Sequence, residues 1–95
     1  MQLREFFLLA VMLGVATSGA LHTLERAEQT PEELLNRHDR GDWGEVPEAD
    51  KHANDYAVQH GFRILSVYTT SAGDRIWILT EADRSATILL LPEEY

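Results

Sequence analysis

The stretch that decides the fold is RIWILTEADRSATILLLPEEY, residues 75–95. Two runs rich in β-branched, aromatic and aliphatic residues, Ile76–Thr80 and Ala86–Leu91, flank the polar pentapeptide Glu81–Ser85. Runs of this composition on either side of a short polar segment are typical of a β-hairpin. The C-terminus is therefore expected to form the rigid centre of the fold, with the pentapeptide exposed at a turn.

Three helices are predicted before this hairpin, over Ser18–Gln29, Pro31–His38 and Pro47–His60. Leu21 and Leu24 give the first helix its apolar spacing. The second begins at a threonine followed by proline and glutamate, a pattern typical of a helix start, and is followed by a glycine. The apolar face predicted for the third helix consists of Ala49, Ala53, Tyr56, Ala57 and His60.

Three strands are predicted over Phe62–Thr69, Arg75–Thr80 and Ala86–Leu91, with a four-residue turn at Ser71–Asp74 joining the first two. The sequence thus predicts an α+β fold, with three short helices packed on a three- to four-stranded antiparallel β-meander. A length of 95 residues fits one domain. Within it, an apolar segment covers residues 1–14, a helical half residues 15–60 and the meander residues 61–95.

Two interpretations fit the apolar N-terminal segment. Phe6 to Ala16 follows Arg4 and precedes small residues up to Ala20, which is typical of a cleaved secretory signal and too short to span a membrane. Alternatively, Leu8–Val15 is a first β-strand at an edge of the sheet, and the chain stays in the cytoplasm. If the segment were removed, the protein would be periplasmic or secreted.

Composition narrows the classes of partner and cofactor. The chain has no cysteine, so disulfides and thiolate chemistry are excluded, and its net charge is −8. Between Glu25 and Asp55 there are ten acidic and four basic residues, a net charge of −6. This charge repels nucleic acid and attracts basic surfaces, so the expected partner is another protein with a basic surface, not nucleic acid or a membrane.

No catalytic residue is assigned, but four residues of the polar turn are candidates: Glu81, Asp83, Arg84 and Ser85. In an enzyme the two carboxylates would transfer protons, the arginine would keep one of them ionised, and the serine would be a nucleophile. In the simpler interpretation these side chains bond backbone groups of the turn. No cofactor is expected, and no histidine or carboxylate spacing predicts a metal site.

The residues predicted to bind a partner are Glu28, Glu32, Glu33, Asp42, Trp43 and Glu45. Regularly spaced carboxylates can imitate a nucleic-acid backbone and occupy a DNA-binding cleft of another protein. Trp43 is expected to act as a lid over the core. His38, beside Asp39 and Asp42, is interpreted either as part of a metal or acid–base site or as a cation at the negative end of a helix.

Several segments resemble a family of small bacterial proteins that occur on chromosomes, plasmids and other mobile elements. The most specific are Gly41-Asp-Trp-Gly44 and Ile76-Trp-Ile-Leu-Thr-Glu-Ala-Asp-Arg-Ser-Ala-Thr87, within a resemblance that covers about Val15 to Tyr95. Members are mostly labelled hypothetical or plasmid-related, and sometimes a type I restriction subunit. The resemblance implies that Val15–Leu21 belongs to the folded domain, which favours the strand over the signal. It implies no catalytic residue.

These observations lead to one expected function and two alternatives. The chain is expected to be a small acidic accessory factor of the cytoplasm that binds another protein and modulates a restriction or other DNA-handling system of mobile elements. The alternatives are a small hydrolase-like enzyme that uses the polar turn, and an exported periplasmic protein.

Overall fold

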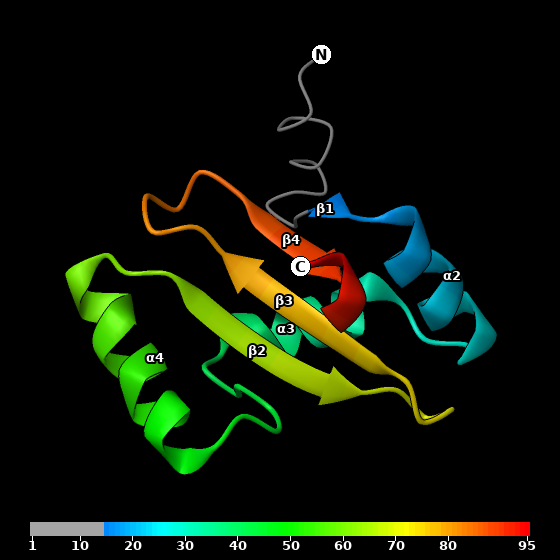
Figure 1. The fold of residues 1–95 in the computed structure, drawn as a ribbon, viewed down its shortest axis with the longest axis horizontal. Helices are drawn as coiled ribbons and strands as arrows, with labels where there is room; N and C mark the ends of the chain where they lie inside the picture. The colour runs from blue at the N-terminus through cyan, green and yellow to red at the C-terminus, as the bar shows by residue number, and fades with distance from the viewer. Residues whose placement is uncertain (1–14) are drawn as a thin grey trace.

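The computed structural model describes residues 15–95, and Figure 1 shows the arrangement of their helices and strands. The elements in chain order are β1 (Val15–Ala16), α2 (Ser18–Arg26), α3 (Pro31–Asp39), α4 (Glu48–His60), β2 (Ile64–Thr69), β3 (Arg75–Thr80), β4 (Thr87–Leu90) and the 3-10 turn η1 (Pro92–Glu94).

The four strands form one mixed sheet in the order β1-β4-β3-β2. β2, β3 and β4 are antiparallel neighbours, as the sequence predicts, and the α+β class is confirmed. The prediction of a wholly antiparallel sheet is wrong, because β1 pairs with β4 in parallel. Strands that the chain joins through a long crossover can run parallel, and here all three helices and two strands lie between them.

The predicted first strand, Leu8–Val15, falls outside the described residues except for Val15, and so does the alternative secretory signal up to residue 14. Val15 and Ala16 lie beside Ile88 and Leu89 of β4. The Thr17 N–H then donates to the Leu89 carbonyl at 3.0 Å, so the chain is held against β4 up to the start of α2.

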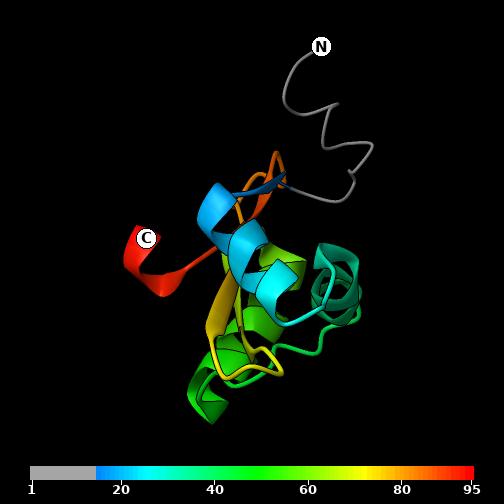
Figure 2. The ribbon, with the colours of Figure 1, turned by 90° about the vertical axis from the view of Figure 1, so that its right-hand side faces the viewer.

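Helices α2 and α3 cover one face of the sheet, and η1 lies on the other, as the view along the sheet in Figure 2 shows. The main core lies under the two helices. Its buried side chains are Ala20, Leu24, Leu34, Leu35, Tyr68, Ile76, Ile78 and Leu89. A second cluster, at the β2 side of the sheet, consists of Trp43, Val46, Ala57, Ile64 and Val67, with Trp77 packed against it.

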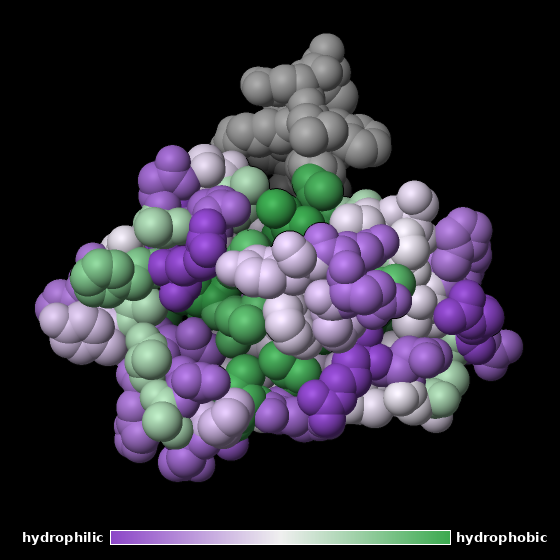
Figure 3. All heavy atoms as spheres, in the orientation of Figure 1, coloured by the Kyte–Doolittle hydropathy of each residue, from purple (hydrophilic) through white to green (hydrophobic). Residues whose placement is uncertain are grey.

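The opposite face of the sheet is also largely apolar. Figure 3 shows it as a green band between α4 and the C-terminal turn. Leu79 and Leu90 are buried on this face, and Trp77 packs against Tyr95 with ring centroids 5.6 Å apart. Both sides of β3 therefore contact other side chains, which explains why its sequence is continuously apolar instead of alternating.

The helix boundaries follow local capping chemistry. The Thr17 hydroxyl accepts from the Ala20 N–H at 3.0 Å, and Thr30 and Glu33 form the predicted reciprocal capping box. The predicted extension of the first helix to Gln29 is wrong: α2 ends at Arg26, and Glu28 has a left-handed φ of 58°. A helix cannot continue through that conformation.

Helix α4 is held at the edge of the sheet mainly by hydrogen bonds. Asn54 pairs with both backbone groups of Leu65, donating to the carbonyl at 2.8 Å and accepting from the N–H at 3.2 Å. Asn54 and Ala57 are the buried residues of the helix. The predicted apolar face is therefore wrong for all but Ala57, because the asparagine, not the alanine and aromatic stripe, turns toward β2; Ala49, Ala53, Tyr56 and His60 are exposed.

Candidate functional site

The polar turn between β3 and β4 is built around Arg84, whose backbone has a left-handed φ of 62°. Its guanidinium donates to the Ala57 carbonyl at 2.6 Å and to the Phe62 carbonyl at 2.7 Å, at the end of α4. It also donates to the carbonyls of Glu81 and Ala82 at 3.1 and 3.2 Å. The Ala57 carbonyl also accepts from the Gly61 and Phe62 N–H groups, so Arg84 adds a side-chain bond from a distant turn to the C-terminal cap of α4.

The predicted pairing of Arg84 with the turn carboxylates is consequently wrong. Glu81 instead accepts from Arg63 at 3.3 Å, and Arg63 also donates to the Tyr95 hydroxyl at 3.1 Å. Asp83 accepts from the Ser85 N–H at 3.0 Å. Hydrogen bonds from Ser85, first from its side chain and then from its backbone, hold the pKa of Asp83 below its ordinary value.

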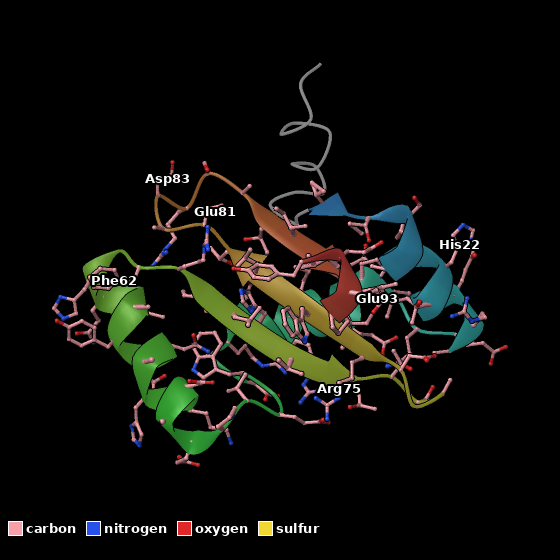
Figure 4. All side chains as sticks on the ribbon, in the orientation of Figure 1. His22, Phe62, Arg75, Glu81, Asp83 and Glu93 are labelled. Atoms are coloured by element: carbon pink, nitrogen blue, oxygen red, sulfur yellow. The ribbon has the colours of Figure 1, made fainter. Side chains whose placement is uncertain are left out.

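The charged groups of the turn thus form contacts that stabilise the fold. Glu81 and Asp83 lie near each other on the upper left of Figure 4, but each has a separate partner. Asp83 is fully exposed to solvent. The backbone-bonding interpretation matches the contacts of Arg84 and Asp83, whereas Glu81 pairs with the Arg63 side chain. The two carboxylates have no binding partner in common.

His38 lies in the last turn of α3 but is only 5% exposed, so its interpretation as a cation at the negative end of the helix is wrong. Nδ1 is 2.6 Å from the Ser66 hydroxyl and Nε2 is 2.8 Å from the Thr80 hydroxyl, which in turn is 2.9 Å from the hydroxyl of Thr87. Burial lowers the pKa of His38 to about 4, so the ring is neutral at pH 7. The hydroxyls satisfy a polar ring that α3 places in the core.

The Gly41–Gly44 motif forms a loop that fixes α3 to β2. Asp42 accepts from Arg37 at 2.7 and 3.3 Å, which is the first cause of the lowered pKa of its carboxyl group. The Tyr68 hydroxyl donates to the Asp42 carbonyl at 2.6 Å. A Cβ on Gly44 would lie 2.0 Å from the Val67 carbonyl oxygen, so glycine is required where this loop approaches the strand.

The predicted partner-binding residues lie in different environments. Trp43 is 7% exposed and donates to Asp55 at 2.9 Å, so it packs into the core as the lid interpretation predicts and offers little surface to a partner. Glu33 closes the capping box, Asp42 pairs with Arg37, and Glu45 accepts from Thr69 at 2.8 Å.

Glu28 and Glu32 are exposed at the junction of α2 and α3. Within residues 15–95, neither side chain takes part in a hydrogen bond or ion pair. These two carboxylates are therefore the members of the predicted set that are available to a partner.

An exposed aromatic group, which is not among the predicted site residues, lies at the end of α4. Tyr56 is 57% exposed and Phe62 is 55% exposed. The Tyr56 ring stacks on the His60 ring with centroids 4.0 Å apart and lies nearly parallel to the Phe62 ring at 6.0 Å. The sequence signal was present in the stripe of residues assigned to the helix core. That stripe predicts an internal contact for Tyr56 and His60, and Phe62 is predicted to begin a strand. Figure 4 shows Phe62 at the outer end of the helix, away from the sheet centre.

Among residues 15–95, no group of three histidine or acidic side chains is arranged to hold a metal ion. No helix in this range combines the length and apolar character needed to cross a bilayer. The described fold is a small α+β domain with an acidic surface. Comparison of the chain with protein-family models, curated proteins and solved structures gives no match. The resemblance to the mobile-element family stays a prediction.

Proposed function

We propose that the protein is a small acidic accessory factor that binds another protein through a basic surface of that partner. The proposal is carried by the position of Glu28 and Glu32, two exposed carboxylates free of hydrogen bonds and ion pairs within the described residues. They lie in the segment that holds a net charge of −6. Carboxylates of this kind raise the encounter rate with a basic partner and favour it over an acidic one.

The family resemblance supplies the sharper form of the proposal. The partner is a restriction enzyme or another DNA-handling protein of a mobile element, and the protein acts with it in the cytoplasm. Such a protein has a basic cleft for the phosphate backbone. An acidic surface at the α2–α3 junction can occupy that cleft in place of DNA.

The test is capture of partners from host lysate by the tagged protein and by a charge-reversal variant. The variant Glu28→Lys/Glu32→Lys leaves Glu33 in place, because Glu33 closes the capping box of α3. A variant with the same change of charge, Asp50→Lys/Glu93→Lys, alters exposed carboxylates on α4 and η1 and serves as the control.

The junction variant is expected to lose the captured protein at low salt, while the control variant retains it. Binding of the wild type should also weaken as salt rises, because the attraction between exposed charges is screened. Equal capture by the wild type and the junction variant would refute the role of these carboxylates. Identification of the captured protein by mass spectrometry decides whether it handles DNA.

A further inference from the structure

The outer face of α4 carries an apolar stripe that nothing in residues 15–95 covers. The stripe consists of Ala49, Ala53, Tyr56 and His60, with Phe62 just beyond the helix. Residues at such spacing share one helix face and usually pack against another element. In this fold the helix instead attaches to β2 through Asn54 and Ala57, on a different side. Figure 3 shows hydrophobic and hydrophilic residues intermixed at the left of the molecule, over α4.

We infer that this face is the interface of a symmetric dimer, in which α4 of one copy packs antiparallel on α4 of a second copy. The order of side chains along the stripe carries the inference. Positions 49 and 60, and positions 53 and 56, lie at equal distances from a point between Asn54 and Asp55, close to the middle of the helix. When two such helices pair in opposite directions, each alanine of one faces an aromatic ring of the other. The small side chains leave space that the large rings fill.

The residues next to the stripe extend the same symmetry. Pro47, just before the helix, is as far from the point between Asn54 and Asp55 as Phe62, which lies two residues after the helix end. Antiparallel pairing therefore places the exposed Phe62 ring of each copy on Pro47 of the other. An aromatic ring and a proline ring are both rigid, so little side-chain entropy is lost when they pack.

Charge along α4 also favours the antiparallel direction. Glu48 and Asp50 lie in the first turn, and His60 lies in the last turn, while the nearby Arg63 already pairs with Glu81. In a parallel pair the acidic ends would lie together. In an antiparallel pair the acidic N-terminal turn of each helix lies beside the C-terminal turn of the other helix. The two helix dipoles then point in opposite directions and attract each other.

The size of the face predicts a weak dimer. Thirteen residues give a helix about 20 Å long, so the contact belongs to the class that buries less than about 1,200 Å² in total. Each copy has a net charge of −8, which opposes association. Added salt screens that repulsion and should strengthen the dimer. Binding to a basic partner has the opposite salt dependence. The test of the dimer is therefore independent of the test of the proposed function.

The first experiment is sedimentation velocity of the purified full chain at rising concentration, up to about 1 mM because the contact is small. The wild type is expected to shift from monomer toward dimer, and to shift further in high salt. The variant Ala53→Glu places a charge at the centre of the stripe, opposite Tyr56 of the other copy. It is expected to weaken association at least about 10-fold, the cost of burying an unpaired charge.

The matched control is Val58→Glu, which makes the same change of charge on the side of α4 away from the stripe, at a residue 53% exposed. It should associate like the wild type apart from a small effect of added charge. Circular dichroism checks that both variants are folded. If Ala53→Glu unfolds, Tyr56→Ser is the second variant, because it removes the ring that faces Ala53.

Cysteine cross-linking tests the direction of the pair, since the natural chain has no cysteine. An equimolar mixture of the single variants Ala49→Cys and His60→Cys should give a mixed disulfide dimer under mild oxidation. Each single variant alone should not, because identical positions would lie about 16 Å apart along the helix pair, beyond the reach of a disulfide.

Three results would overturn the inference. The first is a monomeric wild type at every concentration and salt. The second is equal loss of association in Ala53→Glu and Val58→Glu, which would indicate a general effect of charge. The third is a monomer whose Ala53→Glu variant loses a protein captured from lysate, which would assign this face to a different partner.

Discussion

Replacing His38 by glutamine (H38Q) removes a titrating ring from the core and keeps a donor and an acceptor at the same place. In the wild type, burial lowers the pKa of His38 from 6.5 to about 4. The folded state therefore binds a proton less readily than the unfolded chain. The stability that depends on the neutral ring is fully present above pH 6.5 and is lost as the pH falls from there toward 4.

The magnitude follows from the shift. Each pKa unit corresponds to about 1.4 kcal/mol, so the full effect is about 3 kcal/mol. Between pH 7 and pH 5 the wild type should lose about 2 kcal/mol of unfolding free energy through this ring alone. Carboxylates whose pKa is lowered in the fold, such as Asp42 and Asp83, also lose stabilising contacts in acid. They do so equally in both proteins, so the difference between wild type and H38Q isolates His38.

Urea unfolding of both proteins at several pH values between 7 and 4.5 measures this difference. The wild-type free energy should fall more steeply than that of H38Q, with a difference in slope that approaches about 1.4 kcal/mol per pH unit below pH 6. An NMR titration of the His38 ring should show no protonation at pH 5.5. Parallel stability curves, or a ring that titrates near 6.5, would refute the claim that this histidine is held neutral in the core.

The remaining predictions concern Arg84 and Gly44, two residues whose contacts stabilise the fold. Arg84→Lys should lower the unfolding free energy by about 2 kcal/mol in urea titration, because lysine cannot reach the carbonyls of Ala57 and Phe62 together; a loss as small as that of Ser85→Ala would contradict the capping role. Gly44→Ala should lower the unfolding free energy by more than about 3 kcal/mol or prevent folding, since its Cβ would overlap the strand. Gly61 has a φ of 76° but open space around it, so Gly61→Ala should lower the unfolding free energy by about 1 kcal/mol. Similar melting temperatures for the two glycine variants would show that the close approach at Gly44 does not limit the fold.

Local patterns in the sequence predicted most of the secondary structure. β3 spans Arg75–Thr80 as expected, and α3 begins at Pro31 after the predicted capping threonine. Such elements are recognisable because the contacts that define them, a capping box or an apolar strand, involve residues close in the chain. The early end of α2 was missed, since a left-handed glutamate leaves no mark in the sequence.

The candidate site contains contacts that local sequence patterns do not predict. The proximity of Arg84 to two carboxylates in the sequence suggested an ion pair, yet its guanidinium reaches backbone carbonyls at the end of α4, which lie 22 and 27 residues away in the chain. His38 was interpreted as a cation at a helix end, yet its ring is buried and bonds Ser66 and Thr80, which come from two different strands. Neither contact could be predicted from spacing along the chain.

The sequence by itself determined the α+β class, the antiparallel meander and the acidic charge, because composition, periodicity and capping act over a few residues. Tertiary structure alone decided which face of each element is buried. Asn54 turned α4 so that its aromatic stripe faces outward, and the return of the chain beside β4 made the sheet mixed. These outcomes depend on contacts between distant residues, whose pairing is set by how the whole chain packs and not by any local pattern.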